Sequence, residues 1–540
     1  MTTRKQLDTL AAERILILDG AMGSLIRNYN LTEADFRGSR FADHKKPLAG
    51  CNDLLCLTKP DLIYGIHKAY LEAGADIIET CSFNATSVSL ADYGIGHLAY
   101  EISRAAASLA RQAADAFSTP DKPRFVAGSM GPTAKSAGIP PDINDPAKRS
   151  ITWDELAAAY YDNARGLLDG GADILLVETI FDTLNAKAAL FAISRLLEEG
   201  QADSRDKVEP ELRRGVDPDL PIMISVTVSG DTGRLLTGQT LEDFCASVFH
   251  ARPWSVGLNC SFGAELLKPH IRKLASLVSC PVSAYPNAGM PDQNGEYAET
   301  PESMAAVLTE YMREGMVNIL GGCCGSGPDH IAAIAAAAKN FPPRPIRVGE
   351  GQFSFSGLKS FPVTKTEGFS FIGKRINPVE NDLFTRFIGE ADYDGAVELV
   401  REMIEKDEGP APGILNINMD GTGEDAQTAM TRFLNLALSY PDIAGTPIML
   451  ESSRWDVIEA GLKTLSGKGI VNALSLTEGT EEFRRKARLI LRYGAAVLVR
   501  PGDRPGPEKA EGGKTEALRR AQALLTEEGF SPEDIIFDVP

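Results

Sequence analysis

Three cysteines in glycine-rich segments are the residues of this 540-residue chain whose spacing best suits metal chemistry. Cys260 follows a short apolar run in the segment VGLNCSFG, and Cys323 and Cys324 are adjacent in the segment NILGGCCGSG. Each segment stands where a strand of a parallel barrel would end, and functional side chains gather at that end of such barrels. Three thiolates suit Zn²⁺ and leave its fourth coordination position open, as in catalytic sites. The sequence therefore predicts a catalytic zinc site at these three residues.

Two other interpretations of the three cysteines stay open. Buried thiols also pack as small hydrophobic side chains, and a glycine-rich loop after the eighth strand of a barrel often binds phosphate. Cys81 is expected beside the metal, because a fourth protein thiolate would close the site. The remaining cysteines are expected to pack or to be inert, and they are Cys51, Cys56, Cys245 and Cys280.

A site of three thiolates favours one kind of chemistry. An alkyl thiol has a pKa near about 8.5, so little of it is nucleophilic at neutral pH. Coordination to zinc deprotonates such a thiol, and three anionic sulfurs keep it electron-rich. Attack on a soft electrophile such as a methyl group is then favoured, whereas water activation more commonly uses histidine and carboxylate ligands.

Short apolar runs alternate with longer helical patterns through the first 340 residues. Their apolar residues occupy consecutive positions, as in strands of a parallel sheet covered on both faces by helices. Eight such runs are expected strands, at residues 15–19, 75–80, 124–128, 172–178, 221–228, 255–259, 281–285 and 317–320. Eight β/α units predict a TIM-type (β/α)₈ barrel over residues 1–340.

A second, shorter series follows a segment rich in proline and glycine. That segment, residues 341–367, is expected to be a linker. Residues 368–540 then contain six expected strands, at 370–375, 413–418, 447–451, 470–475, 495–500 and 534–538. Closure of a barrel of this type takes eight strands. We therefore expect an α/β chain with two TIM-type barrels in tandem, the second one incomplete.

Charge and composition exclude several classes of protein. A formal net charge of −19 repels the phosphate backbone, so nucleic-acid binding is not expected. No apolar run is long enough to cross a membrane, and the N-terminal residues are too polar for a signal peptide. The sequence therefore predicts a cytoplasmic protein without a disulfide framework.

Six motifs of the first barrel resemble the zinc-dependent homocysteine methyltransferase family. They are DGAMGS at 19–24, ETCSFNAT at 79–86, VETIFD at 177–182, GLNCSFG at 257–263, YPNAG at 285–289 and GGCCG at 321–325. The resemblance implies that Cys260, Cys323 and Cys324 bind zinc and that the homocysteine sulfur takes the open position. In the cobalamin-dependent methionine synthases, the asparagine that corresponds to Asn287 can approach the zinc when substrate is absent.

The resemblance also implies how the rest of homocysteine is held. The family uses the carboxylates at Asp19 and Glu178 to bind the substrate's amino group, and both residues end expected strands at the same barrel mouth. The alternative is that these carboxylates only cap backbone amides of the loops. The amides around Gly20 and Gly23 can receive the substrate carboxylate, because backbone N–H groups at a helix start attract anions.

The second half resembles the folate-binding barrel of cobalamin-dependent methionine synthases through FIGKRIN, ILNINMD, IMLESSRWDVIEAGL, GKGIVNALS and DIIFD. The resemblance implies a pterin site with polar side chains at Asp420, Glu451, Asn472 and Asp538. Two residues depart from the family pattern: Glu451 replaces an aspartate, and Lys374 replaces an acid. A folate-barrel fragment that does not bind folate is therefore an open alternative.

These resemblances imply a methyltransferase that makes methionine. A zinc-bound homocysteine thiolate would accept a methyl group from methylcobalamin, which 5-methyltetrahydrofolate would remethylate on the second barrel. The segment DxHxxG typical of cobalamin binding is absent from these 540 residues, so a further cobalamin-binding domain or protein is the expected partner. Rival hypotheses are an enzyme with another methyl donor and a non-catalytic zinc-binding module.

Overall fold

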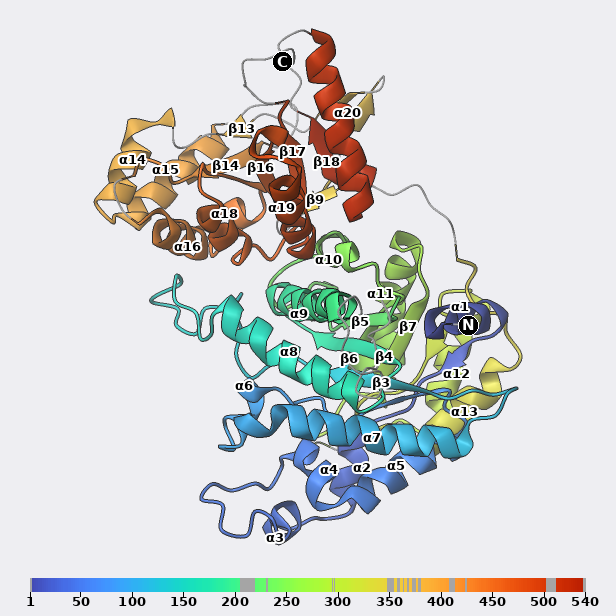
Figure 1. The fold of residues 1–540 in the computed structure, drawn as a ribbon. Coiled ribbons are helices and arrows are strands. Elements are labelled where there is room, and N and C mark those ends of the chain that lie inside the picture. Colours follow the sequence, from blue (N-terminus) through green and yellow to red (C-terminus); the bar gives the residue numbers. More distant parts are fainter. Residues whose placement is uncertain are drawn as a thin grey trace.

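Two parallel sheets, each flanked by helices, follow one another along the chain in this computed structural model (Figure 1). The structure describes residues 2–203, 219–229, 232–293, 295, 297–346, 354–356, 360–362, 364–366, 369–371, 375–376, 380–406, 413–422, 425–501 and 511–537. None of its described helices is both long and apolar enough to cross a membrane.

The first sheet is a closed barrel of eight parallel strands, as predicted. The strands pair in the order β1-β8-β7-β6-β5-β4-β3-β2, and a bridge between Leu18 and Ile77 closes the ring between β1 and β2. Their bounds are Leu16–Ile17 (β1), Ile77–Glu79 (β2), Phe125–Met130 (β3), Ile174–Ile180 (β4), Ile222–Val226 (β5), Ser255–Gly263 (β6), Val282–Asn287 (β7) and Ile319–Leu320 (β8). Every expected strand of this barrel is present.

Helices surround this barrel, and the N-terminal helix closes the end at which its strands begin. Several of these helices begin with a recognisable signal, such as the capping box of Thr152 and Glu155 before α8. The surrounding helices are α5 (Pro60–Ala73), α7 (Ala99–Phe117), α8 (Trp153–Asp169), α9 (Thr183–Asp203), α10 (Leu241–Val248), α11 (Ala264–Leu277), α12 (Pro301–Arg313) and α13 (Pro328–Ala338). Leu7 and Ala11 of α1 (Thr3–Glu13) pack into the barrel interior, so the functional end is the opposite one, where the strands finish.

Short strands form in and just after the segment 341–367, whose role as a linker stays a prediction. Two antiparallel pairs form, β9 (Ser354–Ser356) with β10 (Ser360–Pro362) and β11 (Thr364–Thr366) with β12 (Phe369–Phe371). The expected strand at 370–375 is therefore divided between β12 and β13 (Arg375–Ile376). Alternation of aromatic and small polar residues supports such pairing, and the prolines and glycines concealed it.

The second sheet has six parallel strands in consecutive order, from β13 to β18. After β13 come β14 (Ile414–Asn418), β15 (Ile448–Glu451), β16 (Ile470–Leu474), β17 (Ala496–Val499) and β18 (Ile535–Phe537). Helices α14 (Asp382–Gly389), α15 (Tyr393–Glu405), α16 (Ala426–Ala437), α18 (Trp455–Leu462), α19 (Thr480–Arg492) and α20 (Glu511–Glu528) accompany them. Within the described residues β13 and β18 do not pair, and the arrangement matches the expected incomplete barrel.

The two units touch along α8, α9 and α10 of the first barrel. The rings of Trp153 and Phe191 pack on Tyr493 of α19 at centroid distances of 5.6 and 4.8 Å. The ammonium of Lys187, which is buried, donates to the carbonyl oxygens of Leu465 (2.8 Å) and Gly467 (3.0 Å). These contacts join the two units without involving the mouth of the first barrel (Figure 1).

Candidate metal centre and its cavity

The three cysteines converge at the mouth of the first barrel. Their sulfur atoms all lie within 4.8 Å of one another, although Cys260 lies in β6 and the other two follow β8. Zinc bound by three thiolates at about 2.3 Å places the sulfurs roughly 3.8 Å apart, so only a small adjustment separates this arrangement from a metal site. Among the described histidine, cysteine and acidic residues, these three form the only such group.

Backbone irregularities aim the functional side chains into the mouth. The register of β6 shifts between Asn259 and Gly263, and Cys260 and Ser261 adopt φ values of 58° and 62°. A second shift in β4 places Thr179 at a φ of 54°, directly after Glu178. Residues other than glycine seldom adopt this conformation, and bulges of this kind commonly redirect side chains at active sites. The strain is therefore located at the predicted ligands.

The thiols share their protons unequally. Hydrogen bonds led by that with Cys260, and including one with Tyr297, lower the pKa of Cys324 to about 2. The corresponding contacts, again led by Cys260, raise the pKa of Cys323 well above its usual value. Three adjacent thiolates repel one another, so a cation is needed before all of them ionise together. This donor set fits a zinc ion.

Two asparagines flank the cysteines. The Asn259 side-chain amide donates to the hydroxyl of Thr179 at 2.7 Å and lies 4.0 Å from the sulfur of Cys323. Asn287 ends β7, between the two cysteine-bearing strands, and its Oδ1 is buried without a hydrogen-bond partner in the described part of the chain. The position of Asn287 near the metal stays a prediction. Its Oδ1 is available as a metal ligand.

The cysteines open onto a cavity of about 650 Å³. Predicted binding residues Gly20, Gly23 and Glu178 line it together with the three cysteines. The N-cap of α2 (Met22–Asn28) is Ala21, which offers no side-chain cap to the backbone amides. Cys81 also lines the cavity, and its thiol donates to the carbonyl of Asn52 at 3.6 Å rather than joining the cysteine cluster.

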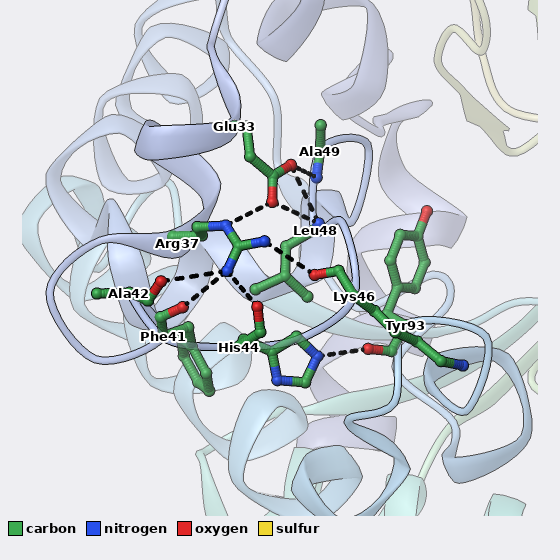
Figure 2. A network of polar contacts seen from close by, with 9 residues as sticks. All are labelled: Glu33, Arg37, Phe41, Ala42, His44, Lys46, Leu48, Ala49 and Tyr93. Carbon is green, nitrogen blue, oxygen red and sulfur yellow. Dashed lines mark hydrogen bonds and ion pairs between the residues drawn. The ribbon is translucent and has the colours of Figure 1, made fainter.

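A network of polar contacts holds the loop that leads to the lining residue Gly50 (Figure 2). The Arg37 guanidinium donates to four backbone carbonyls of the loop that follows α3 (Glu33–Arg37), those of Phe41, Ala42, His44 and Lys46. The Glu33 carboxylate accepts from the amides of Leu48 and Ala49. The loop that ends at Gly50 is therefore held by contacts within the loop itself.

Acidic side chains lie at and beside the inner end of the cavity: Glu79 and Glu178 line it, and Asp19 lies next to Glu79. Asp19, 2% exposed, accepts from the backbone amide of Glu79 at 3.0 Å through Oδ2, and its Oδ1 has no partner among the described residues. Glu178 accepts from the hydroxyls of Ser129 and, at 3.5 Å, Tyr285. Burial raises the pKa of Asp19 well above its usual value and that of Glu178 to about 7. An ammonium group placed here would relieve both shifts.

Two functional candidates were missed by the sequence analysis. Glu79 ends β2 and lines the cavity beside Asp19 and Glu178. It lay at the end of an expected strand, so the reasoning that selected Asp19 and Glu178 also applies to it. Tyr297, which hydrogen-bonds to Cys324, lies in a loop after β7, and no signal in the sequence marks it.

At the second barrel two of the predicted pterin residues, Glu451 and Asp420, already have protein partners. Glu451 accepts from the Asn416 amide at 2.6 Å and pairs with Arg500 at 3.4 Å. Asp420 accepts from the Ser452 hydroxyl at 2.6 Å and from the Ser453 amide at 2.7 Å. Both polar atoms of the buried Asn472 side chain lack partners among the described residues. The predicted residues Asp538 and Lys374 lie outside the described residues.

Comparison with known families decides the assignment of the first barrel. Residues 16–338 match the model described as homocysteine S-methyltransferase, which is more than half of the chain. The chain belongs to the homocysteine S-methyltransferase family. Residues 373–540 match the model of pterin-binding enzymes. A homocysteine S-methyltransferase domain followed by a pterin-binding domain fits the N-terminal part of a methionine synthase, as the motifs predicted.

Comparison with solved structures finds only limited similarity to this member of the homocysteine S-methyltransferase family. The homocysteine methyltransferase MmuM from Escherichia coli, in its oxidized form, is 23% identical with a TM-score of 0.45, over 62% of this chain and 98% of the other. The carboxyl transferase domain of Rhizobium etli pyruvate carboxylase with oxamate and biotin is 12% identical with a TM-score of 0.31, over 65% and 53%. The family assignment rests on the sequence match.

Proposed function

We propose that this methyltransferase converts homocysteine to methionine with zinc held by Cys260, Cys323 and Cys324, and with methylcobalamin as the methyl donor. The observation that carries the proposal is the convergence of three thiols within 4.8 Å at a cavity whose inner end holds unpaired acidic groups. When bound, zinc supplies the Lewis acidity that lowers the pKa of a thiol substrate.

The residues of the first domain, which we assign to positions 1–340, bind and orient the amino acid. Asp19 and Glu178 hold the ammonium group, because both are buried acids and neither pairs with a basic side chain among the described residues. The backbone amides around Gly20 and Gly23 hold the carboxylate, since α2 begins there without a side-chain cap. Asn287 offers its free Oδ1 to the metal before substrate binds.

The second domain, positions 368–540 after the connecting segment 341–367, is proposed to bring 5-methyltetrahydrofolate to the cobalamin. Asn472 supports this proposal most directly, since its amide has both a free donor and a free acceptor for a pterin ring. Asp420, Glu451 and Asp538 are proposed to complete the site. The cobalamin itself is carried by a further domain or a partner protein, and the reactions are those of a cytoplasmic enzyme.

Demethylation of exogenous methylcobalamin tests the proposal. The zinc-loaded chain should convert methylcobalamin to a demethylated form, with stoichiometric methionine, only when homocysteine is present. Cys323→Ala should abolish the reaction, and Cys280→Ala, away from the cluster, should leave it intact. Methionine formed from another methyl donor but not from methylcobalamin would identify a different methyltransferase. Zinc binding without methionine from any donor would indicate a non-catalytic module.

A further inference from the structure

Glu79 is a buried acid at the active cavity to which the proposed mechanism gives no role. It ends β2 within the motif ETCSFNAT, and its side chain lines the cavity shared by the three cysteines. Its Oε1 is shielded from solvent and has no hydrogen-bond partner within the described residues. A buried acceptor without a partner destabilises the protein, so an acceptor of this kind in a binding cavity indicates a missing ligand group.

The inner end of the cavity has an excess of negative charge. Burial raises the pKa values of Asp19 and Glu79, and the nearby charge of Glu178 raises both further. Arg27 is the only basic side chain among the described lining residues, and its guanidinium donates to the carbonyl of Gly295 at 3.2 Å. The positive charge that these acids require must therefore arrive with the ligand.

The free acceptor atoms show which acids are available to that charge. Ser129 and Tyr285 already donate to the two oxygens of Glu178. Asp19 has one oxygen free, Oδ1, and Glu79 has Oε1 free. The backbone amide of Glu79 donates to Asp19 at 3.0 Å, which holds these two residues side by side at the ends of β1 and β2.

We propose that Glu79 binds the ammonium group of homocysteine together with Asp19, and thereby makes the site selective for thiols that carry an α-amino group. The proposal rests on the proposed function, since it assumes that homocysteine is the thiol. An ammonium group has three N–H donors and no acceptor. Asp19 Oδ1 and Glu79 Oε1 accept two of these donors, and Glu178 adds negative charge from β4.

The selectivity can be measured with two thiols that differ only in the amino group. L-homocysteine and 4-mercaptobutyrate share the thiol, the chain length and the carboxylate. Their dissociation constants from the zinc-loaded full chain, obtained by calorimetry, give a ratio that reports the ammonium contact alone. Glu79→Gln keeps the backbone amide that positions Asp19 and the size of the side chain, but removes the charge.

In Glu79→Gln, the dissociation constant of homocysteine should rise about 10- to 100-fold, the value of a hydrogen bond between charged groups. The constant of 4-mercaptobutyrate should stay unchanged or fall, because that ligand is repelled by Glu79. Glu302→Gln, on the exposed first turn of α12, is the matched control and should leave both constants unchanged. Glu79→Asp keeps the charge on a shorter side chain and should restore part of the ratio.

An equal change for the two thiols in Glu79→Gln would overturn the proposal, because it would show that Glu79 only maintains the cavity. An unchanged ratio in both Glu79 variants would overturn it as well, while leaving the proposed function intact. If the wild-type chain bound neither thiol, the proposed function itself would be wrong, and the assignment of Glu79 with it.

Discussion

The two barrel mouths treat their acidic side chains in opposite ways. In the first barrel, Asp19 and Glu79 each have a buried oxygen without a partner among the described residues, and Glu79 lines the cavity onto which the cysteines open. In the second barrel, Glu451 pairs with Asn416 and Arg500, and Asp420 accepts from Ser452 and Ser453.

This difference teaches where ligand binding can be inferred from geometry. Unpaired buried acids are costly in the free protein and become favourable only with a cationic ligand, so they indicate a site prepared for one. Acids that already have partners must give up hydrogen bonds before they bind a pterin. The mouth of the first barrel is therefore organised before its ligand binds. The acids at the mouth of the second barrel become free only if their side chains rearrange.

Among the tests of this difference, removal of one cysteine from the first mouth should have the largest effect. The wild-type chain should hold about one zinc per chain. Cys323→Ala should lose most of that zinc and all methyl transfer, because two thiolates bind a catalytic ion far more weakly than three. Metal analysis after dialysis against a weak chelator measures the loss, with Cys280→Ala as the control. Full zinc retention after replacement of all three cysteines would contradict the assignment.

Ligand titration should give the next largest difference. Homocysteine should bind the zinc-loaded chain and release a proton, because zinc accepts only the thiolate. 5-Methyltetrahydrofolate should bind more weakly than homocysteine, since Glu451 and Asp420 must first release the protein groups that they contact. Calorimetry in buffers with different ionisation enthalpies measures both affinities and the proton. Micromolar binding of the folate would show that the second mouth opens easily, and identical heats in all buffers would mean that the thiol does not ionise.

Much of this architecture was accessible from the sequence. The first eight strands follow from consecutive apolar residues, and the cysteine cluster follows from its position in β6 and after β8. The bulges at Thr179 and Cys260 were not accessible, because they arise from register shifts between neighbouring strands. Whether Glu79 or Glu451 has a partner also depends on side chains far apart in the chain, which a strand pattern does not specify.

Removing an acid should change the free energy of unfolding in opposite directions at the two mouths. Asp19→Asn removes an unpaired buried acid and should raise the free energy of unfolding of the ligand-free protein by about 1 kcal/mol at neutral pH, while weakening homocysteine binding. Glu451→Gln removes a partly exposed ion pair and should lower it by about 0.5–1 kcal/mol. Urea denaturation of each variant tests the signs. Destabilisation by Asp19→Asn would mean that this carboxylate supports the fold rather than the ligand.

The pH dependence of the free energy of unfolding should also differ between the two mouths, and this is the smallest of the expected effects. Burial raises the pKa of Glu178 from 4.5 to about 7, so its stabilising contribution is present below pH 4.5 and is lost as the pH rises to 7. Burial of Asp420 is outweighed by hydrogen bonds led by that from Ser452, and its pKa is lowered. Its contribution is present above pH 3.8 and is lost as the pH falls below that value.

Denaturation of Glu178→Gln and Asp420→Asn across this pH range measures the two contributions against the wild type. The wild-type chain should lose its advantage over Glu178→Gln as the pH rises. It should lose its advantage over Asp420→Asn as the pH falls. Parallel pH profiles for the wild type and both variants would remove the distinction between the mouths.

The buried ammonium of Lys187 has a consequence for how the chain is made. Its carbonyl partner at Leu465 lies 278 residues later in the sequence. At about 5–20 residues per second, the ribosome needs roughly 14–56 s to bridge that interval. The first barrel, complete by Ala338, must therefore fold while Lys187 is still hydrated and while Trp153 and Phe191 await Tyr493. The nascent chain therefore passes through a stage in which the first barrel exposes the apolar surface around Trp153 and Phe191. This surface is covered once the second unit has been synthesised and has folded.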